Sequence, residues 1–329
     1  MKQWKTMYVF AIVVFMAHEA GAATINLAAL IPDEKKFQAV LEEIRDQAGA
    51  GYHIDVIDVN KKMAVDAVAG RCKSLHAVGL ILMDYKAINT AKALQQYDST
   101  FNALPKFVFM TLLADMTARG LSNAAGITFE VPFFTLVTNF RIISGKDFSR
   151  IGIFYRNSFA RSVEESRKLL ERERIKICAV CVDCDQSKKP SIGNTVRIMN
   201  DSLDKLVLEE KVEAFIIPAD NLIVNSKSLS EFWNRKIKEK RIPAIAAIDL
   251  LASEKFGTAV FAADPDLVQL GAQAANQIVE HFENNMSMEK IGFEPTISIK
   301  STVNVHVADE LGWKLKSEKL GRITTIIKY

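Results

Sequence analysis

Residues 212–275, VEAFIIPADNLIVNSKSLSEFWNRKIKEKRIPAIAAIDLLASEKFGTAVFAADPDLVQLGAQAA, decide the fold class of this chain. The stretch contains three short apolar runs bounded by turn residues, namely Ala214–Pro218, Pro243–Ile248 and Thr258–Ala262. Short apolar runs of this kind are typical of strands that are buried on both faces of a sheet. A charged, helix-forming segment separates the first two runs, so the stretch predicts alternating strands and helices.

The third run leads into a helix. Asp264 is expected as its N-cap residue, with Pro265 at the first helical position, because both residue types favour those places. Apolar residues then recur at helical spacing, at Leu267, Leu270, Ala274, Ile278 and Phe282. This periodicity predicts a helix with one face packed on the sheet.

The same alternation runs through the rest of the 329 residues. The strands predicted before the opening stretch are Ile25–Ile31, Tyr52–Val59, Ala77–Met83, Lys106–Leu112, Ala125–Phe129, Arg150–Tyr155 and Ile175–Val182. Repeated strand–helix units with short connections give an open, doubly wound, mostly parallel α/β sheet. Two such series in a chain of this length predict two α/β domains. The apolar, β-branched segment Arg322–Tyr329 predicts one extra strand.

Composition and charge exclude some classes of function. The chain is 49% hydrophobic and 25% charged, which is ordinary for a soluble globular protein. A formal net charge of +3 is too small to indicate nucleic acid as a partner. The dense basic run RKIKEKR at 235–241 is interpreted as the solvated face of a helix, with Ile237 pointing inward.

The first 22 residues have the pattern of a secretory signal peptide. Lys2 and Lys5 form a charged start, Met7–Ala17 an apolar core, and Ala20-Gly21-Ala22 a small-residue cleavage site. The apolar run is too short to span a bilayer. The pattern predicts a soluble, exported protein in the periplasm.

The cysteines leave three interpretations open. Cys178, Cys181 and Cys184 form the motif CAVCVDC, which could hold a metal or an iron–sulfur cluster, act as a redox pair, or form a Cys181–Cys184 disulfide. Residues three apart in a strand point to opposite faces, and three cysteines leave a tetrahedral site one ligand short. We therefore expect no metal and no cofactor.

Several segments carry a resemblance to a known family. They are VEAFIIPADN, RIPAIAAID and GTAVFAADPDLVQLGAQAA in the opening stretch, AGITFEVPFF at 125–134, SRIGIFYRNSFARSVEESRKLL at 149–170 and ISIKSTVNVHVADELGW at 297–313. Together they resemble solute-binding proteins of ABC-type importers, in the group of tryptophan/tyrosine-type binding proteins. The resemblance covers roughly residues 24–315 and implies the type I periplasmic binding fold, with two doubly wound α/β lobes joined by a hinge.

The resemblance also implies that the chain crosses between the lobes three times, near 129–132, 247–250 and 290–296. The expected N-terminal lobe is then 23–130 plus 249–290. The expected C-terminal lobe is 131–248 plus 291–329.

Ligands of open α/β sheets bind outside the carboxyl ends of the strands, so the residues just after each strand are the candidates for a binding site. They are Asp33, Asp84, Tyr85, Asp115, Tyr155, Asn157, Ser158, Asp220, Asn221 and Asp249. Asp220, which ends a fully apolar strand, is the foremost of them, since a carboxylate there could bind a ligand ammonium. A second interpretation of Asp33 and Ser158 is that they cap helices.

Enzymatic motifs find no support in the sequence. It contains no Walker P-loop, no GxSxG motif and no HExxH motif, and its histidines are scattered. We therefore expect a non-enzyme. The family resemblance implies that it binds a small organic molecule, such as an amino acid or a related aromatic or apolar acid, and delivers it to a membrane permease.

Two loops depart from the family pattern. Met83-Asp84-Tyr85-Lys86 replaces a loop of the Gly-Thr/Ser type, and Leu112-Leu113-Ala114-Asp115-Met116 replaces a turn of the Ser/Asp-Pro type. Both changes fall on the N-terminal wall of the expected cleft. They favour an alternative in which the protein is a periplasmic sensing or interaction partner of a membrane receptor.

Overall fold

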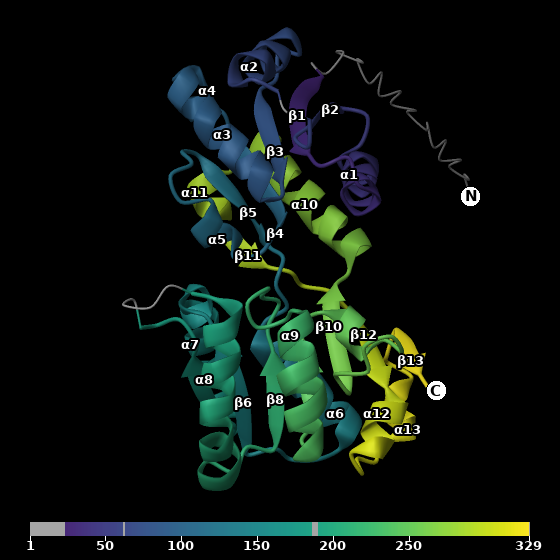
Figure 1. The fold of residues 1–329 in the computed structure, drawn as a ribbon. Helices are drawn as coiled ribbons and strands as arrows, with labels where there is room; N and C mark the ends of the chain where they lie inside the picture. The colour runs from purple at the N-terminus through teal and green to yellow at the C-terminus, as the bar shows by residue number, and fades with distance from the viewer. Residues whose placement is uncertain (1–23, 62, 186–189, 329) are drawn as a thin grey trace, which may run out of the picture.

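The computed structural model describes residues 24–61, 63–185 and 190–328. The predicted signal peptide, residues 1–22, lies outside this range. Figure 1 shows two lobes, one above the other, each built on its own sheet with helices on both faces. Among the helices of the described residues, none combines the length and the apolar character needed to cross a bilayer.

The first lobe is built on a six-stranded parallel sheet with the strand order β11-β5-β4-β3-β1-β2. Its strands are β1 (Ile25–Ile31), β2 (Tyr52–Asp58), β3 (Gly79–Met83), β4 (Lys106–Thr111), β5 (Ala124–Thr128) and β11 (Phe293–Pro295). Every residue of β3 and β4 is buried, because helices cover both faces of the sheet.

Alternate residues of β1 show how these helices are placed. Leu27, Ala29 and Ile31 pack in one core with α1 (Lys35–Ala48) and α10 (Leu267–Phe282). Ala28 and Leu30 pack in a second core with α2 (Val65–Ser74) and α3 (Tyr85–Tyr97). The strand period of two therefore divides the lobe into two apolar layers.

The second lobe is built on a seven-stranded sheet with the order β13-β12-β10-β9-β8-β6-β7, in which only the β10–β12 pair is antiparallel. Its strands are β6 (Arg150–Tyr155), β7 (Lys176–Cys181), β8 (Ala214–Ile217), β9 (Ala244–Ala246), β10 (Phe261–Pro265), β12 (Ile299–Asn304) and β13 (Thr325–Ile327). The predicted extra strand is confirmed, since β13 pairs with β12.

Helices also cover both faces of this second sheet. α6 (Phe133–Ser144) and α7 (Ala160–Arg172) pack on one face, and α8 (Ile192–Asp204) and η3 (Leu229–Ile237) on the other. The shorter helices of the two lobes are α4 (Thr100–Ala103), α5 (Ala114–Thr117), η1 (Asn157–Phe159), η2 (Lys205–Glu209), α9 (Ser226–Ser228), η4 (Asp249–Ala252), α11 (Met288–Ile291), α12 (Val305–Glu310) and α13 (Ser317–Leu320). In the basic run 235–241, Ile237 is 2% exposed, which confirms the interpretation of that run as a helix face.

Two predicted helix caps are wrong. Pro265 is the last residue of β10, paired with Ile299, so the helix α10 begins later and Asp266 caps it by accepting the backbone N–H of Val268 at 3.1 Å. At α1 the N-cap position is Glu34, and no side chain caps the helix, so Asp33 does not act as a cap.

The chain passes between the lobes three times. It leaves the first sheet between β5 and α6, returns between β10 and α10, and leaves again between β11 and β12. Two predicted boundaries therefore move. Residues 249–265 belong to the second lobe because β10 pairs with β9, and β11 belongs to the first lobe because it pairs with β5.

Cys181, the last residue of β7, forms a disulfide with Cys184. Cys72 and Cys178 are free thiols and both are buried. Of the interpretations of CAVCVDC, the structure supports the disulfide, and the two sulfur atoms of Cys181 and Cys184 are used in that bond. Burial raises the pKa of the Cys72 thiol to about 11, which makes it a poor nucleophile.

Candidate functional site

The carboxyl ends of the parallel strands in the two lobes point toward one another (Figure 1). β5 runs into the first crossing, so its end faces the second lobe, and β4 and β3 run parallel to it. β10 runs into the second crossing, so its end faces the first lobe, and β9 and β8 run parallel to it. The loops after these strands are where ligands of open α/β sheets bind.

On the first lobe, the candidates are spread along this edge. Asp33 is exposed, and its backbone N–H donates to Asp58 at 3.3 Å. Asp84 has a left-handed φ of 83° and caps α3 by accepting the N–H of Lys86 at 3.3 Å. Tyr85 is 60% exposed. Asp115 lies on α5, where its side chain reaches the second lobe.

On the second lobe, Asp220 is buried, with its side chain 4% exposed. Its carboxylate pairs with Arg156 at 3.2 Å and accepts the backbone N–H of Leu222 at 2.8 Å. Arg156 also pairs with Asp183 at 3.1 Å, so the three side chains join the ends of β6, β7 and β8. Asp220 therefore stabilises the loops after these strands, a role that the sequence did not indicate.

The remaining candidates of the second lobe differ in accessibility. Tyr155 is half-buried at the end of β6, and Asn157 and Asn221 are exposed. The backbone N–H of Asn157 donates to the carboxylate of Asp183 at 2.6 Å. Ser158 lies in η1, one residue before Phe159, which is the N-cap residue of α7, so Ser158 is not its cap.

Asp249 and Asp264 lie together where β9 ends and β10 crosses back. The backbone N–H of Asp249 donates to the carboxylate of Asp264 at 3.1 Å. Burial, and then the negative charge of Asp249, raise the pKa of Asp264 to about 7. This carboxyl group therefore titrates near neutral pH.

A cavity of about 440 Å³ lies between the lobes beside the first and third crossings. Of the candidates, Asp115 and Ser158 line it, and the other eight do not. The volume is within the range of small-molecule sites. Its apolar lining includes Leu113, Met116, Val131, Phe133, Leu169 and Phe293.

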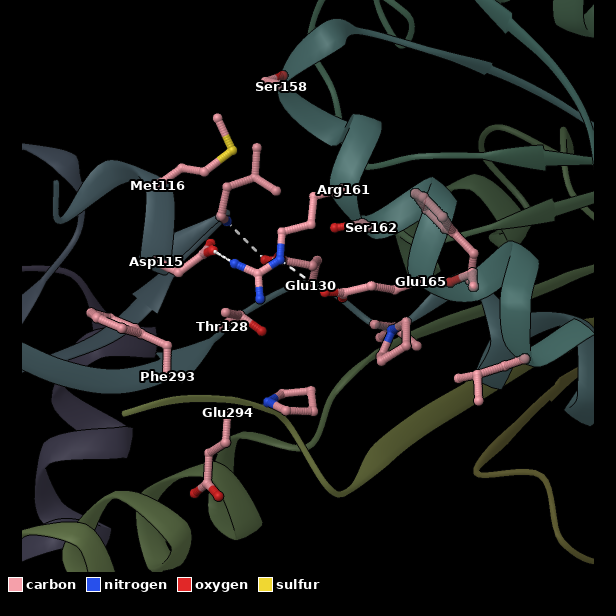
Figure 2. Close-up of a pocket in the computed structure, with 17 residues that line it drawn as sticks. Asp115, Met116, Thr128, Glu130, Ser158, Arg161, Ser162, Glu165, Phe293 and Glu294 are labelled. Carbon is pink, nitrogen blue, oxygen red and sulfur yellow. Dashed lines mark hydrogen bonds and ion pairs between the residues drawn. The ribbon is translucent and has the colours of Figure 1, made fainter. Parts of the chain in front are cut away.

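Charged side chains meet at the centre of this cavity (Figure 2). Arg161 of α7 pairs with Asp115 of the first lobe at 2.7 Å and with Glu165 of its own helix at 2.8 Å. Glu130, in the first crossing, accepts the backbone N–H of Leu113 at 2.8 Å. The Arg161 side chain is 66% exposed, so its charge is partly solvated.

The carboxyl group of Glu130 has an unusual environment. Burial raises its pKa above the ordinary value, against the lowering effect of the Leu113 N–H, and the charge of nearby Asp115 raises it further. Leu113 presents that N–H from a left-handed conformation with a φ of 51°. A carboxyl group with a perturbed pKa inside a cavity is a common mark of a functional site.

Sequence reasoning missed Glu130 and Arg161. Glu130 lies in TFEVPFF, where it is the only charged residue in an apolar run that changes lobes, and this was a usable signal. Arg161 lies on a helix and not directly after a strand. Its place beside Asp115 depends on how the lobes meet, which no local pattern predicts.

The comparisons with known proteins bear on the fold. No protein-family model matches the chain, and no curated protein matches it. Among solved structures, it is similar to the ligand-free, open structure of a substrate-binding protein with adhesive properties from Clostridium difficile. The TM-score is 0.63 at 17% identity, over 93% of this chain and 100% of that chain.

A second similar structure is an ABC domain from Streptococcus pneumonia in complex with L-Trp, with a TM-score of 0.54 at 16% identity, over 92% of this chain and 100% of that one. A third is a conserved domain protein from Vibrio cholerae, with a TM-score of 0.52 at 15% identity, over 92% and 99% of the two chains. The predicted fold is confirmed: the chain has the type I periplasmic binding protein fold. The tryptophan/tyrosine group stays a prediction.

Proposed function

We propose that the protein is the exported solute-binding component of an ABC-type importer, and that it holds a small organic ligand between its lobes. The observation that carries the proposal is the interlobe cavity of about 440 Å³, which both lobes and two of the crossings line. A ligand in this place would contact both lobes at once. Its binding energy would then favour closure about the crossings.

The similar structures support a binding role. The Clostridium difficile protein is a substrate-binding protein, and the Streptococcus pneumonia domain holds L-Trp. In this proposal the chain performs no catalysis. Its partner is a membrane permease, and its place is the periplasm after removal of residues 1–22. An amino acid or a related aromatic or apolar acid is the first ligand class to test, on the basis of the family resemblance.

The proposal is tested by a thermal-shift screen of the chain from Ala23, with amino acids, aromatic acids, amines, nucleosides and sugars. A ligand at 100 times its dissociation constant stabilises the folded state by about 2.7 kcal/mol, which shifts the melting temperature measurably. A hit should also make the protein more compact in small-angle scattering. If a broad panel gives no shift, the sensing alternative becomes the better account.

Leu169→Trp is the variant that locates the site. Leu169 lines the cavity and is 39% exposed, so a larger ring can fill the cavity from its rim without disturbing a packed core. We expect this variant to keep the melting temperature of the free protein and to lose the shift. Leu208→Trp is the control, because Leu208 is 65% exposed and does not line the cavity. A ligand that shifts both variants equally binds elsewhere.

A further inference from the structure

The ionised groups in the cavity are mostly negative. Among the described residues that line it, Asp115, Glu130, Glu165 and Glu294 are acidic, and Arg161 is the only lysine, arginine or histidine. The two ion pairs of Arg161 engage Asp115 and Glu165. The guanidinium is therefore already shared by two carboxylates, and a ligand carboxylate would have to compete with both.

Glu294 and Glu130 differ in where their carboxyl groups point. The Glu294 carboxylate turns away toward α10 (Figure 2), where it accepts from Gln273 and Gln277 at 2.9 Å each. Glu130 stays beside the cavity, and the hydrogen bond to it comes from the neutral N–H of Leu113. Among the described residues, neither Glu130 nor Glu294 is paired with a cationic side chain, and of these two only Glu130 keeps its carboxyl group beside the cavity.

The rest of the lining suits an apolar body. Two aromatic residues line the cavity, Phe133 from α6 of the second lobe and Phe293 from β11 of the first. Met116 and Leu169 add aliphatic surface at the rim. Aromatic rings also attract a cation that is partly desolvated.

We propose that the interlobe cavity selects an organic cation, in which a protonated amine or quaternary ammonium group pairs with Glu130 and an apolar or aromatic body packs against Phe133 and Phe293. The inference rests on the proposed binding function and names the ligand class for it. It departs from the amino acids and acids that the family resemblance favours. Those ligands bring a carboxylate, for which the described residues that line the cavity offer no unpaired cation.

Binding of a cation should depend on pH. The cation favours the ionised form of Glu130, whereas burial favours the neutral form, so binding weakens as pH falls and the Glu130 carboxylate is protonated. The charged groups around it are Asp115 on α5, Arg161 and Glu165 on α7, and Glu294 on β11. Glu294 and Glu165 stay bonded to their own partners, so Glu130 is the group expected to be protonated.

The test compares three probes with the same body and different charge: phenethylamine, phenylalanine and 3-phenylpropionate. Choline and hexylamine are added as cations without a ring. Dissociation constants are measured by calorimetry on the chain from Ala23, in two buffers of different ionisation enthalpy to count any protons released on binding. We expect phenethylamine to bind at least tenfold more tightly than the other two phenyl probes.

Glu130→Gln should reduce the affinity for phenethylamine about tenfold or more, because it removes the charge partner at nearly constant volume. Glu164→Gln is the matched control, since Glu164 lies on α7 and pairs with Arg167 away from the cavity. If Glu130→Gln fails to fold, Leu169→Trp blocks the cavity instead. Tighter binding of phenylalanine or 3-phenylpropionate overturns the inference and leaves the proposed function standing. The inference is also overturned, with the proposed function still standing, if none of these cations binds and a sugar or a nucleoside binds instead.

Discussion

Asp115 of α5 and Arg161 of α7 form an ion pair of 2.7 Å between carboxylate and guanidinium, and the two residues belong to different lobes. Arg161 also pairs with Glu165 within its own helix, so the guanidinium is held in place from the second lobe. The pair lies on the wall of the cavity, beside the first crossing. It therefore connects the arrangement of the lobes to the site where a ligand would bind.

Loss of this pair should loosen the lobes without unfolding the protein. We expect Arg161→Ala to change the free energy of unfolding by less than about 1 kcal/mol, because exposed ion pairs contribute little. The same variant should broaden the distribution of interlobe distances. Spin labels at Tyr97 and Leu208, which are exposed and lie in different lobes, report those distances by pulsed electron resonance.

Arg167→Ala is the control for this prediction. Arg167 forms an ion pair with Glu164 at 3.1 Å, and this pair lies within α7 and does not connect the two lobes. It should leave the distance distribution unchanged. Equal distributions for the wild type and Arg161→Ala would show that the ion pair does not restrain the lobes.

The Asp249–Asp264 pair predicts a pH dependence of stability. Asp264 has a pKa of about 7 in the folded protein and an ordinary value near 4 when unfolded. Because the folded state holds the proton more tightly, this group stabilises the fold below about pH 4, and the contribution is lost as pH rises through 7. The loss is at most about 4 kcal/mol, from 1.36 kcal/mol per pKa unit.

Urea unfolding between pH 4.5 and 8 measures this effect as the difference between wild type and Asp264→Asn. We expect the variant to become the more stable of the two as pH rises. Asp249→Asn should narrow the pH range over which the stability changes, because it removes a negative charge that raises the pKa of Asp264. Asp309→Asn, at an exposed position of α12, is the control and should run parallel to wild type. If the stabilities of wild type and Asp264→Asn change in parallel with pH, Asp264 does not have a raised pKa in the folded protein.

Sequence patterns predicted the strands well, because each buried strand is a local apolar run. Ile25–Ile31 and Arg150–Tyr155 were predicted with the bounds that the structure has. The prediction of the lobe boundary near 249 was wrong for a different reason. β10 joins the second sheet by pairing with β9, which precedes it, and with β12, which lies beyond the whole of α10, and local sequence patterns do not show which strands pair.

The site was harder to predict than the fold. Asp220 looked like a free carboxylate after a strand, but its partner Arg156 lies 64 residues away. Glu130 was missed although its place as the only charged residue in the apolar run TFEVPFF was a usable signal. Arg161 left no such signal, because its pairing with Asp115 depends on how the two lobes meet.

Lys106 is a buried lysine in β4 whose ammonium donates to three backbone carbonyl groups, those of Phe101 and Leu104 at 2.7 Å and of Ser122 at 2.9 Å. Lys106→Met should lower the free energy of unfolding by about 2 kcal/mol or more, because the carbonyl groups lose their donor in a buried place. Chemical denaturation at pH 7 measures the loss. Lys36→Met, at an exposed position of α1, is the control and should cost less than about 0.5 kcal/mol.

Burial also lowers the pKa of Lys106 to about 8. The unfolded chain then binds more protons than the folded one between about pH 8 and 10, so the wild type should gain stability over Lys106→Met as pH rises through that range. A difference between the two proteins that does not change with pH would mean that Lys106 keeps its ordinary pKa.

The disulfide between Cys181 and Cys184 predicts three results of a thiol titration. The folded protein should show no rapidly reacting thiol, because Cys72 and Cys178 are buried and burial raises the pKa of both. The unfolded protein should show two thiols without a reductant and four with one, since the chain has four cysteines. The double variant Cys181→Ser with Cys184→Ser should lose up to about 2 kcal/mol of stability, as expected when a very short loop is opened. Cys72→Ser serves as the comparison, because it changes the number of thiols in the unfolded, unreduced protein to one and leaves the disulfide in place.

Four reactive thiols in the unfolded, unreduced protein would show that the disulfide does not form. A metal analysis of the purified protein would then be the next measurement, because Asp183 lies between the two cysteines and the three side chains lie close together.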